Sequence, residues 1–470
     1  MTRFLLAVSC AAVAVQTSRA QRCATGCQLI DYRSSITTDN NGPLDLKAFA
    51  FYPRNLAPGD HAPLAVVMHG YSPTSTFGSF RPHAERLANE GFVAVLVAMR
   101  GRDGSDGVRD SGGLEIYDIY DAVEHVKAMP FFAERINPTN VHITGYSGGG
   151  GNVMSALTKF PDYFRLGSSH FGISDYGFDP VTGWYVNGAN VGATRTGILD
   201  ADVGDPVSAR QPGGDTKVLD RYQAIASNLA SQNNPYSEIH LFVNMDETIS
   251  PPINSTSYRD NAVAAAVAPG EFDNITLHLG ESDGSVWVDH NGDSIQQDDE
   301  IQDFPHGDSL ASQRRGEAWY LERLRQGVIP APDLRDADVL AVAGWGRTRP
   351  FELFLGDGQD AAGALSYELS ENALSFKLAI ESIDKSVHGR LTVSPDALPA
   401  ERFAVELNGE VIGSADASSP FTYQSLGDGD HLRLVSVPEP SGLVVGFVTL
   451  VALATQQRLY WPSPFGANAE

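Results

Sequence analysis

The chain has 470 residues, of which 33 are basic and 58 acidic, and its formal net charge at pH 7 is −25. This length provides for one large domain and one smaller domain. The acidic excess excludes a nucleic-acid-binding protein, because no basic surface is available to meet phosphates. It favours a protein that stays soluble in salt, binds divalent cations, or does both.

Residues 1–20 have the pattern of a secretory signal peptide. Arg3 supplies the basic start, an apolar run follows over residues 4–15, and residues 18–20 (Ser-Arg-Ala) provide a cleavage site. We therefore expect this segment to be removed. The mature protein is expected to be exported, to the cell envelope, the cell surface or the medium.

The chain contains three cysteines. Cys10 lies in the segment that export would remove, which leaves Cys23 and Cys27. Two cysteines in an exported chain most simply pair with each other, so a disulfide is expected between them. Their spacing indicates neither a zinc site nor a catalytic thiol.

Residues 21–329 are predicted to form one α/β domain. Strands are expected at 44–52, 64–68, 92–99, 141–144, 165–169, 239–244 and 275–279, and helices at 81–91, 114–128 and directly after residue 147. This alternation predicts a doubly wound, mostly parallel sheet. Residues 175–235 look irregular and are expected to form a cap over the site. Trp184 and Tyr185 there are either substrate contacts or ordinary packing residues under a long loop.

A second, all-β domain is predicted at residues 338–436. It follows a helix expected at 309–326 and a proline-containing linker at 330–337. Asn408-Gly409 between two apolar runs is a strong hairpin signal. Short strands with turn signals predict a sandwich, and its last part resembles bacterial immunoglobulin-like modules. Such a module is expected to bind a cell-surface or extracellular polymer. The strands are expected at 351–355, 374–380, 390–393, 403–407 and 432–437.

The candidate nucleophile is Ser147, in Gly145-Tyr146-Ser147-Gly148-Gly149. This is a G-x-S-x-G motif with a predicted strand before it and a predicted helix after it. A serine on such a sharp turn presents its hydroxyl to a substrate, and the glycines keep the turn free of steric clash. The alternative interpretation is a glycine-rich loop with an incidental serine.

A serine hydroxyl becomes a nucleophile only beside a base that a carboxylate orients. In α/β-hydrolases the chain order is serine, acid, histidine. The acid should follow the next-but-one strand after the nucleophile, so we predict Asp246 rather than its neighbour Glu247. The histidine should lie beyond the last strand, where His306 fits better than His290.

The oxyanion that forms during acyl transfer needs two main-chain donors. One is expected from Gly148, the residue after the nucleophile, and the other from the loop after the third strand. His69-Gly70-Tyr71 ends that strand, so the Tyr71 amide is the second predicted donor. His69 itself is interpreted as a packed structural histidine.

The segment from residue 69 to 175 resembles the catalytic domain of the prolyl oligopeptidase family and related α/β-hydrolase esterases. The resemblance implies hydrolysis of carboxylic esters or peptide bonds through an acyl-serine. The chain has no room for that family's β-propeller, which leaves peptidase activity open. The competing function is a non-catalytic surface-binding protein on a hydrolase scaffold. The matching stretches are the serine motif and residues 160–165, 172–175 and 246–251.

An acidic insertion at residues 281–303 resembles a calcium-binding loop. Ser294 occupies the usual glycine position, and no helix is predicted before the loop. The insertion is either a structural calcium site or a solvated acidic loop, and no cofactor is expected for catalysis. Aligned on D-x-[DN]-x-[DN]-G-x5-E, the predicted ligands are Asp289, Asn291, Asp293, the Ile295 carbonyl, Gln297 and Glu300.

Residues 437–470 resemble a PEP-CTERM sorting signal. Pro438-Glu439-Pro440 precedes an apolar run at 443–454, which ends before Arg458. The run is shorter than the roughly 20 residues of a stable membrane span. The resemblance implies a membrane transpeptidase of the exosortase type as a transient partner. A membrane-dipping helix is the alternative interpretation.

Overall fold

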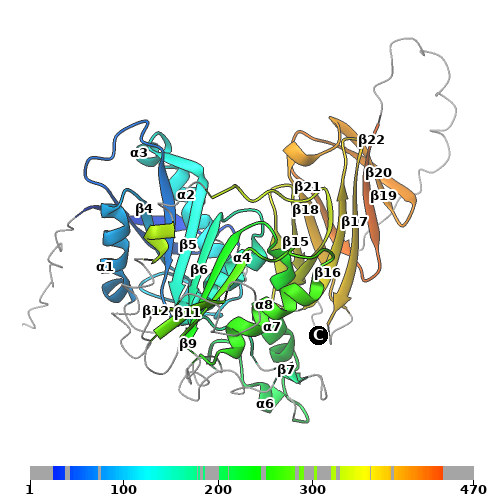
Figure 1. Cartoon of the computed structure of the whole chain (residues 1–470). Helices are drawn as coiled ribbons and strands as arrows, with labels where there is room; N and C mark the ends of the chain where they lie inside the picture. The colour runs from blue at the N-terminus through cyan, green and yellow to red at the C-terminus, as the bar shows by residue number, and fades with distance from the viewer. Residues whose placement is uncertain are drawn as a thin grey trace, which may run out of the picture.

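Two β-sheets organise the chain, an α/β region in the first two thirds and a β region near the carboxyl end (Figure 1). We call residues 25–323 the α/β region and residues 337–436 the β region. The computed structural model describes residues 25–36, 43–71, 76–176, 178–179, 184–185, 199, 201–209, 211–244, 250–280, 285–289, 301–303, 319–323, 329–359, 361–382 and 386–437.

The sheet of the α/β region has ten strands in the order β1-β2-β4-β3-β5-β6-β9-β10-β11-β12. The six central strands, from β4 to β10, run parallel, and two strands at each end pair antiparallel. The predicted mostly parallel sheet is confirmed. The strands are β1 (Gly26–Arg33), β2 (Asp45–Tyr52), β3 (Ala62–Met68), β4 (Val93–Ala98), β5 (Ile136–Tyr146), β6 (Leu166–His170), β9 (Glu238–Asn244), β10 (Ile275–Gly280), β11 (Ser285–Asp289) and β12 (Ile301–Asp303).

Helices cover both faces of this sheet, as a doubly wound fold requires. Along β3, Leu64 and Val66 enter the core under α2 and α4, whereas Ala65 and Val67 enter a second core under α1. Successive side chains of a strand point to opposite faces of the sheet. A strand that is covered by helices on both faces therefore needs an unbroken run of apolar residues. The helices are α1 (Thr76–Asn89), α2 (Glu115–Ala128), α3 (Pro130–Ala133), α4 (Gly148–Lys159) and α8 (Ile253–Ala265).

The segment expected to be irregular, residues 175–235, contains helices, so that expectation was incomplete. Helix α7 (Lys217–Ile225) packs one face against Tyr71 and Tyr176. Trp184 and Tyr185 form β8, and their side chains lie outside the described part. The other elements here are α6 (Pro206–Ala209), the 3-10 helix η1 (Ser227–Asn233) and the hairpin of β7 (Phe178–Asp179) with β8 (Trp184–Tyr185).

The β region is one antiparallel ladder of ten strands, ordered β20-β19-β22-β17-β16-β13-β14-β15-β18-β21. The ladder folds over itself. Phe351 of β15 packs on Phe376 of β17, a strand that it does not pair with, at a ring separation of 5.3 Å. A single continuous sheet thus makes the two layers of the predicted sandwich. The elements are β13 (Ala337–Ala343), β14 (Trp345–Arg347), β15 (Phe351–Leu355), β16 (Ala362–Leu369), β17 (Ala373–Glu381), β18 (Gly389–Val393), η3 (Pro395–Ala397), β19 (Arg402–Leu407), β20 (Glu410–Asp416), β21 (Phe421–Leu426) and β22 (His431–Ser436).

The hairpin predicted at Asn408-Gly409 joins β19 to β20. Both turn residues have positive φ, 52° at Asn408 and 84° at Gly409. A two-residue turn of this kind matches the twist of the flanking strands, and asparagine followed by glycine adopts it with little strain. The local sequence therefore predicts this turn correctly.

The two regions share a hydrophobic core. Trp345 of β14 is fully buried and belongs to the same core as the helices of the α/β region. Its ring lies 5.1 Å from that of Tyr117 on α2 and 5.1 Å from that of Phe160 at the end of α4. Phe354 of β15 stacks on its other side at 5.8 Å. The β region therefore completes the packing of the α/β region.

Buried polar contacts reinforce this junction. Lys159 of α4 donates to the carbonyl oxygens of Ala224 in α7 and Ala343 in β13. Burial lowers the pKa of Lys159 to about 7. The Asn233 side chain donates to the Ala341 carbonyl at 2.7 Å and accepts from the Ala341 amide at 2.8 Å. These bonds hold β13 against the α/β region at a fixed register.

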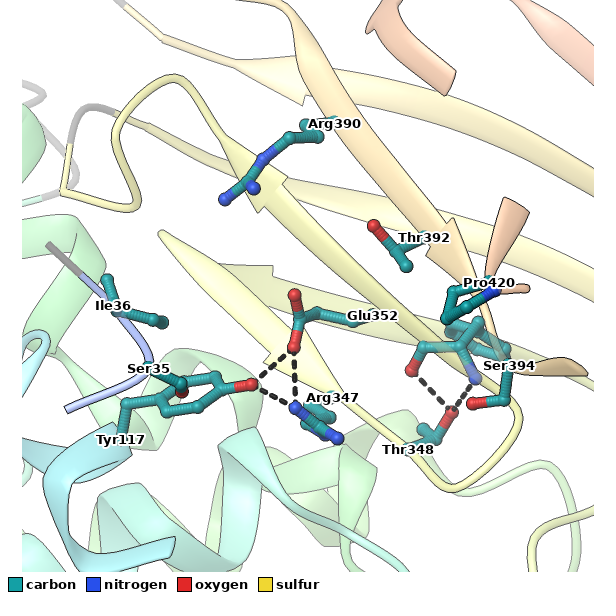
Figure 2. A pocket seen from close by; sticks show the side chains of 11 residues that line it. Ser35, Ile36, Tyr117, Arg347, Thr348, Glu352, Arg390, Thr392, Ser394 and Pro420 are labelled. Atoms are coloured by element: carbon teal, nitrogen blue, oxygen red, sulfur yellow. Dashed lines mark hydrogen bonds and ion pairs between the residues drawn. The ribbon is translucent and has the colours of Figure 1, made fainter. Parts of the chain in front are cut away.

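A cavity of about 430 Å³ opens at the surface of the junction. Figure 2 shows Tyr117 of α2 meeting Arg347 and Glu352 of the β region in a closed triangle of contacts. The Tyr117 hydroxyl donates to Glu352 at 2.5 Å, and Arg347 lies 3.0 Å from the same carboxylate. The cavity is thus bordered by an ion pair of the β region and by a tyrosine hydroxyl of the α/β region.

The predicted sorting segments lie outside the described residues, apart from Val437. Cys27 is disulfide-bonded, and its partner cysteine also lies outside them. Within the described part, no helix is long and apolar enough to cross a membrane.

Candidate active site

Ser147 stands at the turn between β5 and α4, where its backbone is strained. Its φ of 57° and ψ of −127° lie in a region that non-glycine residues rarely adopt. The Ser147 amide donates to the His170 carbonyl of β6 at 2.8 Å, which ties the turn to the neighbouring strand. Such strain persists only where the surrounding structure imposes it, and it concentrates at functional sites.

Glycines make this turn possible. A methyl group on Gly145 would lie 2.4 Å from the carbonyl oxygen of Gly149. One on Gly148 would lie 2.6 Å from the main-chain nitrogen of Tyr71. Both approaches are shorter than any van der Waals contact, so a side chain at either position would push the turn apart. The G-x-S-x-G spacing is therefore required by packing.

The same approach brings the two predicted oxyanion donors together. Tyr71 lies three residues after the end of β3, and its main chain packs on Gly148 at the first turn of α4. The first amides of a helix have no partner within the helix, and its N-terminus favours negative charge. Beside the half-exposed Ser147, these amides can hold an oxyanion.

Two buried histidines near the serine, His69 and His170, have structural roles. His69 is fully buried, its Nδ1–H donates to the Gly70 carbonyl at 2.9 Å, and burial lowers its pKa to about 4. His170 lies between the rings of Tyr146 and Phe242, at 4.3 and 4.4 Å, and burial lowers its pKa well below the usual value. The packing role of His170 was not predicted from the sequence.

The other two members of the predicted triad lie outside the described residues. β9 ends at Asn244, two positions before Asp246, which agrees with the expected chain order. His306 is one of these two members. Glu247, the alternative acid, and His290, the alternative histidine, also lie outside the described residues. Their placement relative to Ser147 stays a prediction.

The predicted calcium ligands also lie outside the described part, apart from Asp289 at the end of β11. β11 pairs antiparallel with β12, so the acidic loop joins the two strands of a hairpin. Among the described residues, no group of three metal-ligating side chains comes together.

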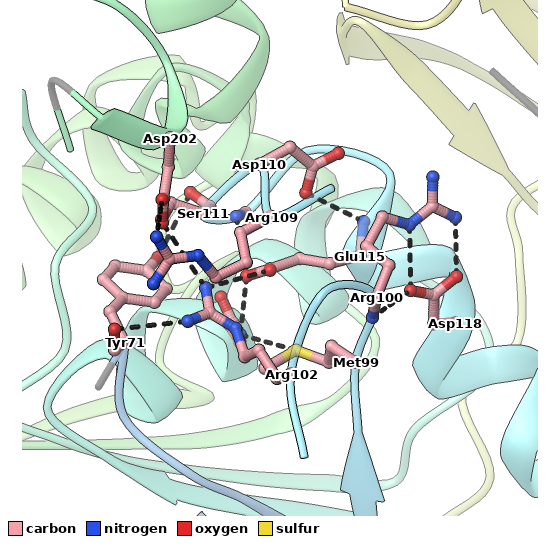
Figure 3. A network of polar contacts seen from close by, with 12 residues as sticks. Tyr71, Met99, Arg100, Arg102, Arg109, Asp110, Ser111, Glu115, Asp118 and Asp202 are labelled. Atoms are coloured by element: carbon pink, nitrogen blue, oxygen red, sulfur yellow. Dashed lines mark hydrogen bonds and ion pairs between the residues drawn. The ribbon is translucent and has the colours of Figure 1, made fainter. Parts of the chain in front are cut away.

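A buried polar network contacts Tyr71, which lies in the segment after β3; we call this segment the oxyanion loop (Figure 3). Arg102 donates to the carbonyl of Tyr71 at 3.2 Å and to the carboxylate of Glu115 at 3.2 Å. Asp202, from the cap segment, lies 3.7 Å from Arg102 and 3.0 Å from Arg109. Burial raises the pKa of Asp202. Sequence reasoning missed this network, because its members come from segments far apart in the chain and share no periodic pattern.

A mixed α/β sheet with a strained serine between strand and helix defines a serine hydrolase of the α/β-hydrolase class. A sequence model of the X-Pro dipeptidyl-peptidase (S15) family matches residues 42–346, which is more than half of the chain. The chain therefore belongs to this family of serine hydrolases. A search of the curated proteins found no match.

Solved structures with a similar fold include esterases and peptidases. An esterase from Pyrococcus furiosus is 15% identical, with a TM-score of 0.40 over 64% of this chain and 93% of that one. The dipeptidyl peptidase 4 of Porphyromonas gingivalis is 15% identical, with a TM-score of 0.38 over 55% and 32%. A puromycin-hydrolyzing peptidase of Mycobacterium tuberculosis is 18% identical, with a TM-score of 0.39 over 54% and 35%. The chain thus spans about a third of either peptidase.

Proposed function

We propose that the protein is an exported serine hydrolase that cleaves carboxylic ester or peptide bonds through an acyl-serine intermediate. The observation that carries the proposal is the backbone of Ser147, with φ of 57° and ψ of −127° at the junction of β5 and α4. A serine held in that conformation beside the first amides of a helix is arranged for attack on a carbonyl.

The proposed reaction has two steps. The Ser147 oxygen attacks the substrate carbonyl and gives its proton to His306, which Asp246 orients. The amides of Tyr71 and Gly148 hold the oxyanion, and His306 then protonates the leaving alcohol or amine as the acyl-enzyme forms. Water, deprotonated by His306, releases the acid and restores the free serine hydroxyl.

Substrate class and nucleophile can be tested together. We expect a fluorophosphonate probe to label Ser147, as mapped by mass spectrometry of the digested protein. Rates on short acyl esters and on X-Pro dipeptide amides would then be compared at equal labelled enzyme. The family membership supports the amides. A protein that the probe does not label, and that hydrolyses neither, would contradict the proposal.

Calcium is proposed to hold the loop that leads to His306. Without metal, the carboxylates of Asp289, Asp293 and Glu300 would repel one another, and the loop would open. A small misplacement of His306 would lower turnover about a hundredfold. We therefore expect chelation to lower turnover far more than it lowers the melting temperature, and Glu300→Gln to act alike. Absence of calcium binding in millimolar titration calorimetry, or unchanged turnover after chelation, would contradict this.

Export and sorting are proposed from the two ends of the sequence. We expect the intact mass of the native exported protein to correspond to a chain that begins at Gln21 and ends near Pro440. The signal-like start and the Pro-Glu-Pro segment support both cleavages. A mass that includes the whole tail would refute sorting by an exosortase-type partner and would favour a membrane-dipping helix.

A further inference from the structure

The loop that carries Tyr71 has little regular structure to hold it. β3 ends at Met68, three residues earlier. The Tyr71 hydroxyl donates to the Ser111 carbonyl at 3.3 Å, and the Tyr71 carbonyl accepts from Arg102 at 3.2 Å. The second contact acts on the main chain next to the amide that would meet an oxyanion.

Arg102 is itself held from two sides. Its side chain is 1% exposed and lies between the carboxylates of Glu115, at 3.2 Å, and Asp202, at 3.7 Å. A guanidinium is planar and presents its donors in a rigid fork, so two anionic partners and one carbonyl fix its orientation. The Tyr71 carbonyl is thereby held in one place.

The network also reaches the helix of the nucleophile. Glu115 accepts from the Asn152 side chain, which lies on α4, at 3.2 Å, and from the Gly112 amide at 3.0 Å. A continuous chain of contacts therefore runs from α4 through Asn152, Glu115 and Arg102 to the Tyr71 carbonyl. The two halves of the proposed oxyanion site, Gly148 and Tyr71, are joined at the back by this chain.

The buried arginine is poorly suited to a purely stabilising role. The Nε of Arg102 is buried and makes no hydrogen bond within the part of the chain described. Replacing buried ion pairs by apolar side chains is often neutral or stabilising. The presence of an arginine with one unused donor is better explained by the group that its other donors hold in place, the Tyr71 carbonyl.

We propose that Arg102 is a positioning residue, which sets the Tyr71 amide for oxyanion stabilisation, and that Asp202 of the cap segment anchors Arg102. This rests on the proposed function of Ser147 and Tyr71. The cap segment thereby acts on the oxyanion site through one side chain, without touching the substrate.

The test compares Arg102→Lys with Arg100→Lys. Arg100 lies two positions away, is 2% exposed and donates to Asp118 at 2.6 and 2.9 Å. Within the described residues, no hydrogen bond or ion pair joins it to Tyr71. Both changes keep the charge and lose the guanidinium fork. We expect Arg102→Lys to lower kcat per probe-labelled site by about 10- to 100-fold, with KM within twofold. Arg100→Lys should lower the melting temperature at least as much and leave kcat within twofold.

A boronic acid inhibitor supplies the second readout, because its tetrahedral adduct places an oxygen at the oxyanion site. Its affinity should fall with Arg102→Lys by the same factor as kcat/KM. Asp202→Asn, the variant to use if Arg102→Lys does not fold, should show a smaller loss in both. Wild-type kcat in Arg102→Lys, or an equal loss of kcat in Arg100→Lys, would overturn the inference. Failure of the proposed function differs, because the wild-type protein itself would then take neither probe nor inhibitor.

Discussion

Replacing Ser147 with alanine is expected to lower kcat by roughly 10⁴- to 10⁶-fold and to abolish labelling by a fluorophosphonate. The change removes only the oxygen that would form the acyl-enzyme. The strained backbone, the glycine contacts and the helix behind it remain, so the melting temperature should change little. Steady-state hydrolysis of an acyl ester, probe labelling and thermal unfolding of the same preparation would measure the three quantities.

Ser155→Ala is the matched control, because Ser155 lies on the same helix and is buried away from the turn. It should keep kcat within twofold. His306→Ala should be as inactive as Ser147→Ala, whereas His290→Ala should remain active. Near-normal turnover in a folded Ser147→Ala protein would contradict the nucleophile. An inactive His290→Ala protein together with an active His306→Ala protein would mean that His290, and not His306, is the catalytic base.

The largest effect on stability is expected from Trp345→Ala. Its side chain fills the space between Tyr117, Phe160 and Phe354, at ring separations of 5.1, 5.1 and 5.8 Å. Removing a fully buried aromatic side chain leaves a cavity and lowers the free energy of unfolding by about 3–5 kcal/mol. Because the ring belongs to the core shared by both regions, denaturant unfolding should also become less cooperative.

Val411→Ala provides the comparison for this measurement. Val411 lies on β20 at the far edge of the β region and is 67% exposed. Its replacement should change the free energy of unfolding by less than about 0.5 kcal/mol. A loss below about 1 kcal/mol in Trp345→Ala would mean that the two regions are stable without their common core.

Much of the fold could be predicted because each element of the α/β sheet carries its own pattern. The unbroken apolar run that became β4 is typical of a strand covered on both faces, and every residue of β4 is buried. The start of α1 was harder to predict from the sequence. The prediction began at residue 81, whereas the helix starts at Thr76 and contains Pro82 inside it. Proline is unfavourable inside a helix, so the residues before Pro82 do not look helical in the sequence.

In the site, too, features set by adjacent residues could be predicted, whereas contacts between distant segments could not. The serine turn is encoded by five adjacent residues, and the structure gives Ser147 the strained conformation that such a motif demands. The Arg102 network joins segments that are far apart in the chain, such as those of Tyr71 and Asp202, so no local pattern predicts it. Only Glu115 and Asp118, three positions apart on one helix, could have indicated that arginines pack there.

The position of Trp345 in the chain has a consequence for biosynthesis. Proteins leave the ribosome from the amino terminus, and domains generally fold as they emerge. Every strand of the α/β sheet is made before Trp345, so Tyr117 of α2 and Phe160 after α4 lack this packing partner until the β region is made. A nascent chain that stops between residues 330 and 344 would carry the serine turn but lack the ring that closes its core. Completion of the core of the α/β region is thereby tied to synthesis of the β region.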